Sequence, residues 1–428
     1  MFLFRSPRQH RPRWLSCHRK LPSRLLPLLA TTLLLAGCDR ALKPPTVLYL
    51  ASGVDADQRI NTELREVFQE RLGLVLKGFR RLHPGTSVQM AIYPEELLLQ
   101  AISRRSRAGL EPDLMLIDGD TALKLRHAGL VDPFPASPDL LRSFDPALLD
   151  RVRDANGRLA GLPVLLHAQL SCYDRRRLRE APRTLEDLLK RSSSDQAVGL
   201  SVDPFNLLWT AGSLGAMPAL DKAASGRAIA QSDREAIERW LRWLQLSSAQ
   251  QRITFFASQP ETDAELMAGR VAWIPCRSMS LPMLRRHLGT RLGVAPLPDG
   301  PNQQRATPVN RLRVLALGRH SSAIGRARAL DFVRYSVNPL TQRTMTTGSL
   351  TVLPANRFVT LPMQGSAVLN AMAVAQEQGQ QVNVLVALLR NTDTPLTGIQ
   401  GLLTQLVFGE ASPAASTEKL VRILQRQG

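Results

Sequence analysis

The sequence predicts an exported α/β protein built from two lobes. Three observations lead to this prediction: apolar strand-like runs alternate with amphipathic helical runs, the chain is long, and its first residues form a basic, then apolar, leader. About 390 residues remain after the leader. A chain of that length normally divides into two domains, each large enough to bury its own core.

The first 37 residues have the composition of a cleaved signal peptide. Seven basic and no acidic residues precede an apolar run from Leu25 to Gly37, which is shorter than the ~20 residues that a spanning helix needs. Leu35-Ala36-Gly37-Cys38 resembles the lipobox of bacterial lipoproteins. This resemblance implies that residues 1–37 are removed, that Cys38 is lipidated, and that residues 38–45 form a tether. An uncleaved signal-anchor is the alternative.

Removing the leader lowers the net charge of the chain. It takes away seven of 55 basic residues and none of the 36 acidic ones, which changes the formal net charge from +19 to +12. A positive surface favours anionic ligands or anionic lipid. Nucleic acid is not expected as a partner, because the chain is exported and has neither a basic helix nor interleaved stacking aromatics.

The two cysteines beyond the leader and Cys38 are Cys172 and Cys276. Both lie in apolar strand-like runs. The exported location permits a disulfide between them but does not require one, and buried free thiols are ordinary in such runs.

The first half of the mature chain predicts a parallel sheet. In chain order we expect a strand at 46–52, a helix at 64–82, a strand at 86–93, a helix at 95–108 and a strand at 113–118. The first helix ends at His83-Pro84-Gly85, a strong stop signal. Asp120 is the expected N-cap of the next helix and Gly129 its terminator. Parallel sheets of this kind bind ligands at the carboxyl ends of their strands.

Two later runs interrupt the alternation of strands and helices. Gly157 to Leu178 contains about ten extended residues after a Gly-Leu-Pro turn, and 311–318 is a second apolar run. Each is expected to cross between the lobes. Each lobe is therefore predicted to consist of two segments of the chain. The first lobe comprises residues 46–166 and 313–338, and the second comprises residues 167–312 and 339–428.

Several blocks, in this order behind the lipobox, resemble a known family. They are "EPDLMLIDGDTALKLRHAGLVDPF", "GRLAGLPVLLHAQLSCYDRRRL", "APRTLEDLL", "ELMAGRVAWI", "LGVAPLPDGP" and "ALDFVRYSVNPLTQRTMTTGSLTVLPAN". Together they are similar to extracellular solute-binding protein family 1, the maltose-binding-protein-like receptors of ABC importers. Leu185 departs from the family pattern, which has Trp there. The resemblance implies a two-lobe periplasmic-binding-protein fold, type II-like, with crossing hinge strands that let the lobes close over a ligand.

Candidate ligand contacts in the first lobe and hinge come from strand ends. Asp118 and Asp120 follow the third strand, and their carboxylates suit sugar hydroxyls or an amine; capping is the alternative for Asp120. His167 and Gln169 lie two residues apart on the crossing run, so we expect both side chains to point the same way. Their alternative role is a hydrogen bond within the hinge.

The remaining candidates come from the resemblance. Trp209 matches the family's stacking tryptophan, with core packing as the alternative. Arg277 and Ser278 follow a strand where family members approach the ligand, and a guanidinium there suits a carboxylate or phosphate. Gly348 lies in the family's late pocket loop. No catalytic motif and no metal-ligand spacing occurs in the sequence, so we expect neither an enzyme nor a cofactor or metal.

The implied function is that of a monomeric, lipid-anchored receptor on the periplasmic side of the cytoplasmic membrane. Its partners would be ABC permease subunits and a small polar solute. A sugar, a glycoside or a polyol is the favoured solute, and a polar solute with an anionic group is the alternative. Aromatic residues make up only 5% of the chain, which argues against a long oligosaccharide groove. The alternative is a transport-inactive lipoprotein of the same fold that senses a ligand or scaffolds a complex.

Overall fold

The computed structural model describes residues 46–54, 62–192, 197–249, 253–362, 365–382, 385–386, 389 and 393–425, without the side chains of 62–71 and 393–395. The predicted leader, Cys38 and the tether lie outside these ranges. Both sheets of the described chain belong to one compact unit.

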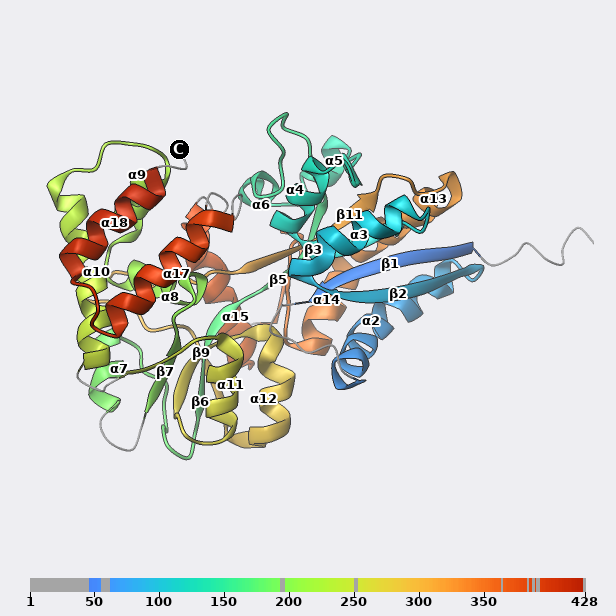
Figure 1. The fold of residues 1–428 in the computed structure, drawn as a ribbon. Helices are drawn as coiled ribbons and strands as arrows, with labels where there is room; N and C mark the ends of the chain where they lie inside the picture. The colour runs from blue at the N-terminus through green and yellow to red at the C-terminus, as the bar shows by residue number, and fades with distance from the viewer. Residues whose placement is uncertain are drawn as a thin grey trace, which may run out of the picture. The chain divides into compact units, whose positions relative to one another are not determined.

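The first lobe is built on a seven-stranded sheet with the order β12-β5-β11-β3-β1-β2, in which β4 also pairs with β11 (Figure 1). Its strands are β1 Thr46–Val54, β2 Thr86–Pro94, β3 Leu114–Asp118, β4 Val131–Asp132, β5 Leu162–His167, β11 Arg311–Gly318 and β12 Leu353–Pro354. β1 pairs in parallel with both β2 and β3, as the predicted alternation of strands and helices requires. β11 runs antiparallel to β3 and β5.

Helices connect these strands. They are α2 Thr62–Leu82, α3 Leu98–Arg107, α4 Gly119–His127, α5 Pro138–Leu141, α6 Pro146–Asp150, α13 Ala323–Ser336 and α14 Pro339–Ser349. α2 ends at the predicted stop signal, and Gly129 follows α4 with a φ of 72°. The predicted N-cap of α4 is wrong: Asp118 occupies that position, and Asp120 lies within the first turn. The helix begins at Gly119, directly after β3, which leaves no room for a cap at Asp120.

The second lobe has a five-stranded sheet with the order β10-β6-β9-β7-β8. Its strands are β6 Gln169–Asp174, β7 Val198–Ser201, β8 Ile253–Phe256, β9 Trp273–Arg277 and β10 Leu292–Ala295. Its helices are α7 Leu185–Arg191, α8 Pro204–Ser213, α9 Met217–Ala224, α10 Gln231–Ala249, α11 Gln259–Met267, α12 Leu281–Leu288, α15 Ala367–Gln378, α17 Asp393–Val407 and α18 Pro413–Gln425. The helices α9, α10, α17 and α18 pack against one another as a layer at the far end of this lobe (Figure 1).

The chain crosses between the sheets at two places, and it passes to the second lobe once more between β12 and α15. It leaves the first sheet at His167 and enters the second at Gln169, so the expected first crossing is confirmed. The second crossing differs from the prediction. β11 lies wholly within the first sheet, and residues 296–310, between β10 and β11, make the passage instead. β12 also pairs with β5, which brings part of 339–428 into the first sheet.

Two hydrophobic cores stabilise this arrangement. The first surrounds the seven-stranded sheet and continues past the crossing through Leu170 and Cys172 to α11 and α12. The second lies between the five-stranded sheet and the helical layer, around Trp209, Trp240 and Trp273. The cores therefore follow the faces of the sheets rather than the lobes, because each face of the second sheet is covered by a different set of helices.

Candidate functional site

A cleft opens where strands of the first sheet end beside the crossings. Gly53 and Val54 end β1, His167 ends β5, and Arg311 begins β11, so the sheet topology brings these positions to one edge. Met279 enters from the second lobe. The complete lining is Gly53, Val54, Leu72, Leu116, Leu165, His167, Met279, Arg311, Arg313, Met345, Ser349, Thr351 and Val352. The cavity measures about 80 Å³, and among these lining residues His167 has the sole ring.

Buried ions form the floor of this cleft. Asp118 accepts a 2.5 Å hydrogen bond from Nε of Arg311 through one carboxylate oxygen, and its other oxygen lies 2.8 Å from Nη1 of Arg313. Glu95 lies 3.1 Å from the same nitrogen of Arg313. These side chains are nearly inaccessible to solvent. Two carboxylates thus balance two guanidinium groups, and the floor carries no net charge.

Backbone groups complete the coordination of Arg313. Its Nη2 donates to the carbonyl oxygens of Gly53, at 2.6 Å, and Leu116, at 2.7 Å. Burial by itself lowers the pKa of Arg313, but the nearby carboxylates of Glu95 and Asp118 outweigh it and raise that pKa above its ordinary value. Arg313 therefore remains charged and ties β1, β3 and β11 together under the cleft.

Asp118 was a predicted ligand contact; it is not a lining residue but lies behind Arg311 and Arg313, with both carboxylate oxygens in ion pairs. Asp120 is half-buried in the first turn of α4 and is not among the lining residues. Gly348 is exposed near the end of α14, while its neighbour Ser349 lines the cleft.

His167 and Gln169 contact different parts of the hinge. The Nδ1 atom of His167 is 3.3 Å from the carbonyl oxygen of Thr351 at the cleft. Gln169 instead donates to the carbonyl of Asn206 and accepts from the backbone N–H of Val309. The chain changes sheets at Ala168, between these two residues.

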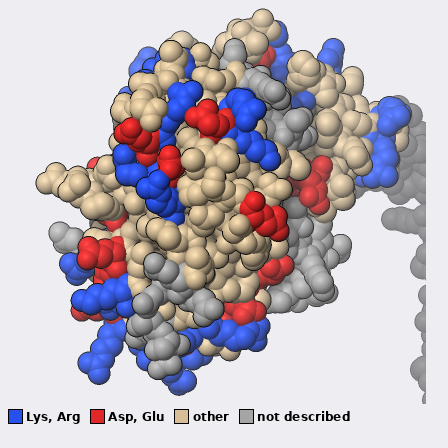
Figure 2. Space-filling model, turned by 60° about the vertical axis from the view of Figure 1, so that its left-hand side comes forward, with Lys and Arg blue, Asp and Glu red and all other residues tan. Residues whose placement is uncertain are grey.

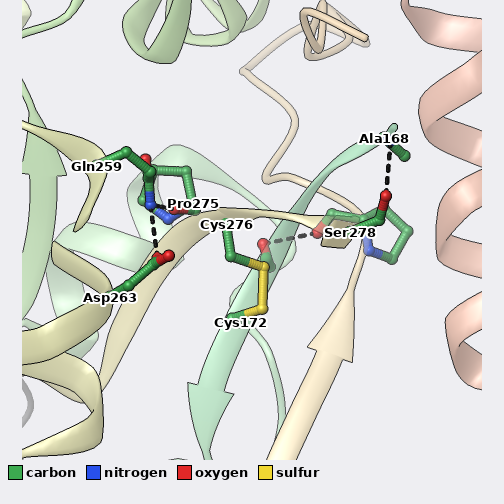
Figure 3. The surroundings of a disulfide bond; sticks show 9 residues. Ala168, Cys172, Gln259, Asp263, Pro275, Cys276 and Ser278 are labelled. Atoms are coloured by element: carbon green, nitrogen blue, oxygen red, sulfur yellow. Dashed lines mark hydrogen bonds between the residues drawn. A yellow bond between two sulfur atoms is a disulfide. The ribbon is translucent and has the colours of Figure 1, made fainter. Parts of the chain in front are cut away.

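Ser278 joins the two lobes beside a disulfide. It donates from its backbone to the carbonyl of Ala168 (2.8 Å), and its hydroxyl accepts from the Ala168 N–H and donates to the carbonyl of Thr351. Figure 3 shows this junction next to the bond between Cys172 and Cys276, which links β6 to β9. The sequence left a disulfide and free thiols open, and the structure contains the disulfide.

Two further polar groups lie at the same edge of the second sheet. Arg277 is half-buried and donates to the side-chain oxygen of Asn206 at 3.2 Å. Asp263 is buried on α11 and accepts from Nε2 of Gln259 at 2.9 Å. Burial raises the pKa of Asp263 to about 6, although hydrogen bonds from Gln259 and Ser280 act in the opposite direction.

Trp209 lies in the second core and not in the cleft. Its side chain has no solvent exposure, and its ring centroid is 6.0 Å from that of Trp273. Its indole nitrogen has no hydrogen-bond partner among the described residues. The structure therefore places Trp209 in the alternative, core-packing role that the sequence left open.

Sequence reasoning missed the ion cluster of Glu95, Arg311 and Arg313. One signal was present: Arg311 and Arg313 alternate within an otherwise apolar strand, so they point to one face of a buried sheet. Charged residues are rarely buried unless they are paired, which would have indicated acidic partners.

The described residues contain no group of three or more His, Cys, Asp or Glu side chains placed to hold a metal ion. Among the same residues, no helix has both the length and the apolar character that crossing a membrane requires.

Most of the chain matches a known protein family. Residues 76–367, more than half of the chain, match the family described as bacterial extracellular solute-binding protein. The chain belongs to this family. Membership makes it a binding protein of the exported type and not an enzyme. A comparison with curated proteins finds no match.

Solved structures of other solute-binding proteins share the fold. The GacH receptor of Streptomyces glaucescens, determined unliganded and with acarbose, has a TM-score of 0.69 and 16% identity, over 89% of this chain and 98% of that one. The maltotriose-binding protein of Thermus thermophilus has a TM-score of 0.67 and 15% identity, over 89% and 99%. A solute-binding protein of Thermotoga lettingae, bound to α-D-tagatose, has a TM-score of 0.64 and 16% identity, over 89% and 99%. At these identities the likeness establishes the fold.

Proposed function

We propose that this protein is the lipid-anchored receptor of an ABC importer. In this proposal it captures a small polar solute, namely a sugar, a glycoside or a polyol, and delivers it to a membrane permease. Residues 1–37 would be removed, and the lipid on Cys38 and the tether at 38–45 would hold a monomer on the periplasmic side of the cytoplasmic membrane.

The observation that supports this function is the cleft beside the crossings. Its floor is charge-neutral, its walls are mostly aliphatic, and polar groups of His167, Ser349 and Thr351 lie among them. Aliphatic walls suit the C–H faces of a sugar or polyol, and the few polar groups suit its hydroxyls. The solved relatives named above were determined with carbohydrate ligands, which agrees with this solute class.

Solute capture would require the lobes to move. The cleft measures about 80 Å³, whereas small-molecule sites typically occupy ~300–1,000 Å³. Domain closure about a hinge is the usual way in which periplasmic receptors admit and enclose a ligand. A ligand would shift the population toward the enclosed form, which a permease then recognises.

A thermal-shift screen of sugars, polyols and phosphorylated solutes tests the solute-receptor proposal. A solute present at 100 times its dissociation constant should add ~2.7 kcal/mol to the unfolding free energy. Ser349→Trp fills the cleft and should abolish the stabilisation. Thr347→Trp, on the exposed side of the same helix turn, should retain it and serves as the control. Absence of stabilisation by every solute would contradict the receptor function.

The anchor is tested separately. Cys38→Ala should abolish lipidation and leave an unprocessed precursor or a soluble protein. Intact mass of the membrane-extracted wild-type protein should show a lipid on a chain that begins at Cys38. An unmodified Cys38 in the mature protein would contradict the anchor.

The second candidate function is a transport-inactive sensor or scaffold. It is favoured by the pairing of Asp118, the expected ligand acid, with two arginines, and by Leu185 in place of the family's Trp. Copurification distinguishes the two functions: a permease and its ATPase indicate import, whereas a membrane sensor indicates signalling.

A further inference from the structure

A second groove lies on the second lobe and shares no lining residue with the cleft. One side is a face of α15 that contains Ala367, Asn370, Val374 and Gln378. The other side consists of the edge strand β10 with the turn after it and the loop 179–183. Two hollows of about 600 and 340 Å³ share Val294 and Ala367, so they form one continuous groove along β10. We call it the arginine groove.

Five arginines line this groove: Arg179, Arg183 and Arg305 in one hollow, and Arg175 and Arg285 in the other. None of them forms an ion pair with an acidic side chain of the described chain. By contrast, Arg291 close by is paired with Asp174 at 3.0 Å. Figure 2 shows that basic and acidic side chains are mixed on the face that it presents. The five arginines of the groove differ from this mixed arrangement, because none has an acidic partner among the described residues.

The charge balance of the groove remains positive when its acids are included. Glu180 and Asp299 are the acidic lining residues, against the five arginines. Asp299 is already used by the fold: it accepts from the backbone N–H of Ala306 at 2.9 Å and from Nε2 of Gln378 at 3.2 Å. Burial without a counter-charge also lowers the pKa of Arg285. A bound acid would relieve this cost.

Gln378 provides an independent observation at the floor of the groove. The side chain is 7% exposed, and its Oε1 atom has no hydrogen-bond donor among the described residues. Its amide orientation is determined by Asp299, because a carboxylate can only accept and must face the NH2 group. A buried carbonyl oxygen without a donor is costly, so an occupant that brings an N–H or O–H group here would be favoured.

We propose that the arginine groove binds an extended, acidic peptide segment of a partner protein. Three of the arginines line one hollow and two line the other, which suits several carboxylates in a row. The 12 residues of α15 span about 18 Å, the length of about five extended residues. A peptide also supplies backbone N–H groups for Gln378, which a flat membrane surface could not bring to a buried amide.

Binding of a labelled hexaglutamate peptide, measured by fluorescence anisotropy, tests this proposal. The protein is the full chain extracted from membranes in a non-ionic detergent, and hexaglutamine is the uncharged control peptide. We expect hexaglutamate to bind, with an affinity that falls as salt rises, and hexaglutamine not to bind. Inorganic phosphate and phosphatidylglycerol vesicles are added as competitors and should not displace the peptide at equal charge concentration.

Matched variants locate the site. Arg183→Glu combined with Arg305→Glu should weaken peptide binding at least tenfold. Arg176→Glu combined with Arg343→Glu makes the same change in net charge at exposed arginines outside the groove, and should weaken it less than twofold. Gln378→Leu, checked for an unchanged melting temperature, should weaken binding without any change in charge.

Three results would overturn the proposal. They are equal weakening by both double variants, binding of vesicles or phosphate in place of the peptide, and no detectable peptide binding at low salt. None of these results would contradict solute binding in the cleft, because the groove and the cleft share no lining residue.

Discussion

Single buried charges determine the character of the cleft. Asp118 was expected to meet a ligand, yet Arg311 and Arg313 occupy both of its carboxylate oxygens. Removing one partner from such a buried pair leaves the other charge uncompensated, which typically costs more than the pair itself contributes. The floor is therefore rigid and electrically neutral. Discrimination between solutes would depend on the other polar lining groups, those of His167, Ser349 and Thr351.

Asp263 makes stability depend on pH. Its folded-state pKa of about 6 exceeds the unfolded value near 3.8, so the folded protein holds this proton more tightly. The stabilisation from protonated Asp263 is therefore complete below about pH 4 and is lost as pH rises through about 6. Between pH 4 and pH 8, Asp263→Asn should therefore gain about 2.5 kcal/mol of stability relative to the wild type, measured by urea denaturation at each pH.

Asp139→Asn is the control for this measurement, because the side chain of Asp139 is 82% exposed. The two variants are compared with the wild type over the same pH range. A flat profile for Asp263→Asn would contradict a raised pKa of Asp263 in the folded protein.

The variant Trp209→Ala distinguishes a core-packing role of this side chain from a ligand-binding role. Because the ring is fully buried beside Trp273, Trp209→Ala should reduce the unfolding free energy by about 3–5 kcal/mol through the cavity that it leaves. The measurement is chemical denaturation together with solute affinity. Nearly unchanged stability with affinity reduced tenfold or more would instead return Trp209 to the ligand site.

At the scale of elements, the disulfide joins two strands that enter the hinge. Cys172 on β6 and Cys276 on β9 are 104 residues apart in sequence, so the bond closes a long loop of the unfolded chain. Cys172→Ala with Cys276→Ala should lower the unfolding free energy by about 2–4 kcal/mol. A reducing agent should lower wild-type stability to the same value and leave the double variant unchanged; an unaffected wild type would contradict the bond.

The elements that could be predicted are those with long, regular patterns. β1, α2, β2, α3 and β3 each have enough residues for an apolar period to stand out, and their parallel pairing follows from their alternation. β4 and β12 are two residues long and carry no period. The second crossing was misplaced because residues 296–310 contain no regular element, whereas β11 resembles any buried strand.

The candidate site was less predictable than the fold, for a physical reason. Sequence spacing orders side chains along one strand or helix, but the cleft joins strand ends that are more than a hundred residues apart. The partners of Asp118 are nearly two hundred residues away along the chain. The positions of the strand ends could be predicted from the sequence. The ion pairs between them could not, because they depend on β11 pairing with β3.

At the scale of the whole molecule, the two crossings are bonded to each other. The backbone N–H of Gln169 donates to the side-chain oxygen of Asn310, and Oε1 of Gln169 accepts from Val309. A solute identified by the thermal-shift screen should therefore decrease the radius of gyration in small-angle scattering, since both crossings would bend as one hinge. A solute that raises stability without changing the radius of gyration would contradict hinge closure.

The bond between Cys172 and Cys276 also has a consequence for when the exported protein becomes fully stable. Disulfides are rare in the reducing cytosol and form after export. A newly made chain would therefore lack this cross-link until it has been exported. The link could form only after the segment with Cys276 has emerged, about a hundred residues behind Cys172. The second lobe would thus reach its full stability only on the far side of the membrane.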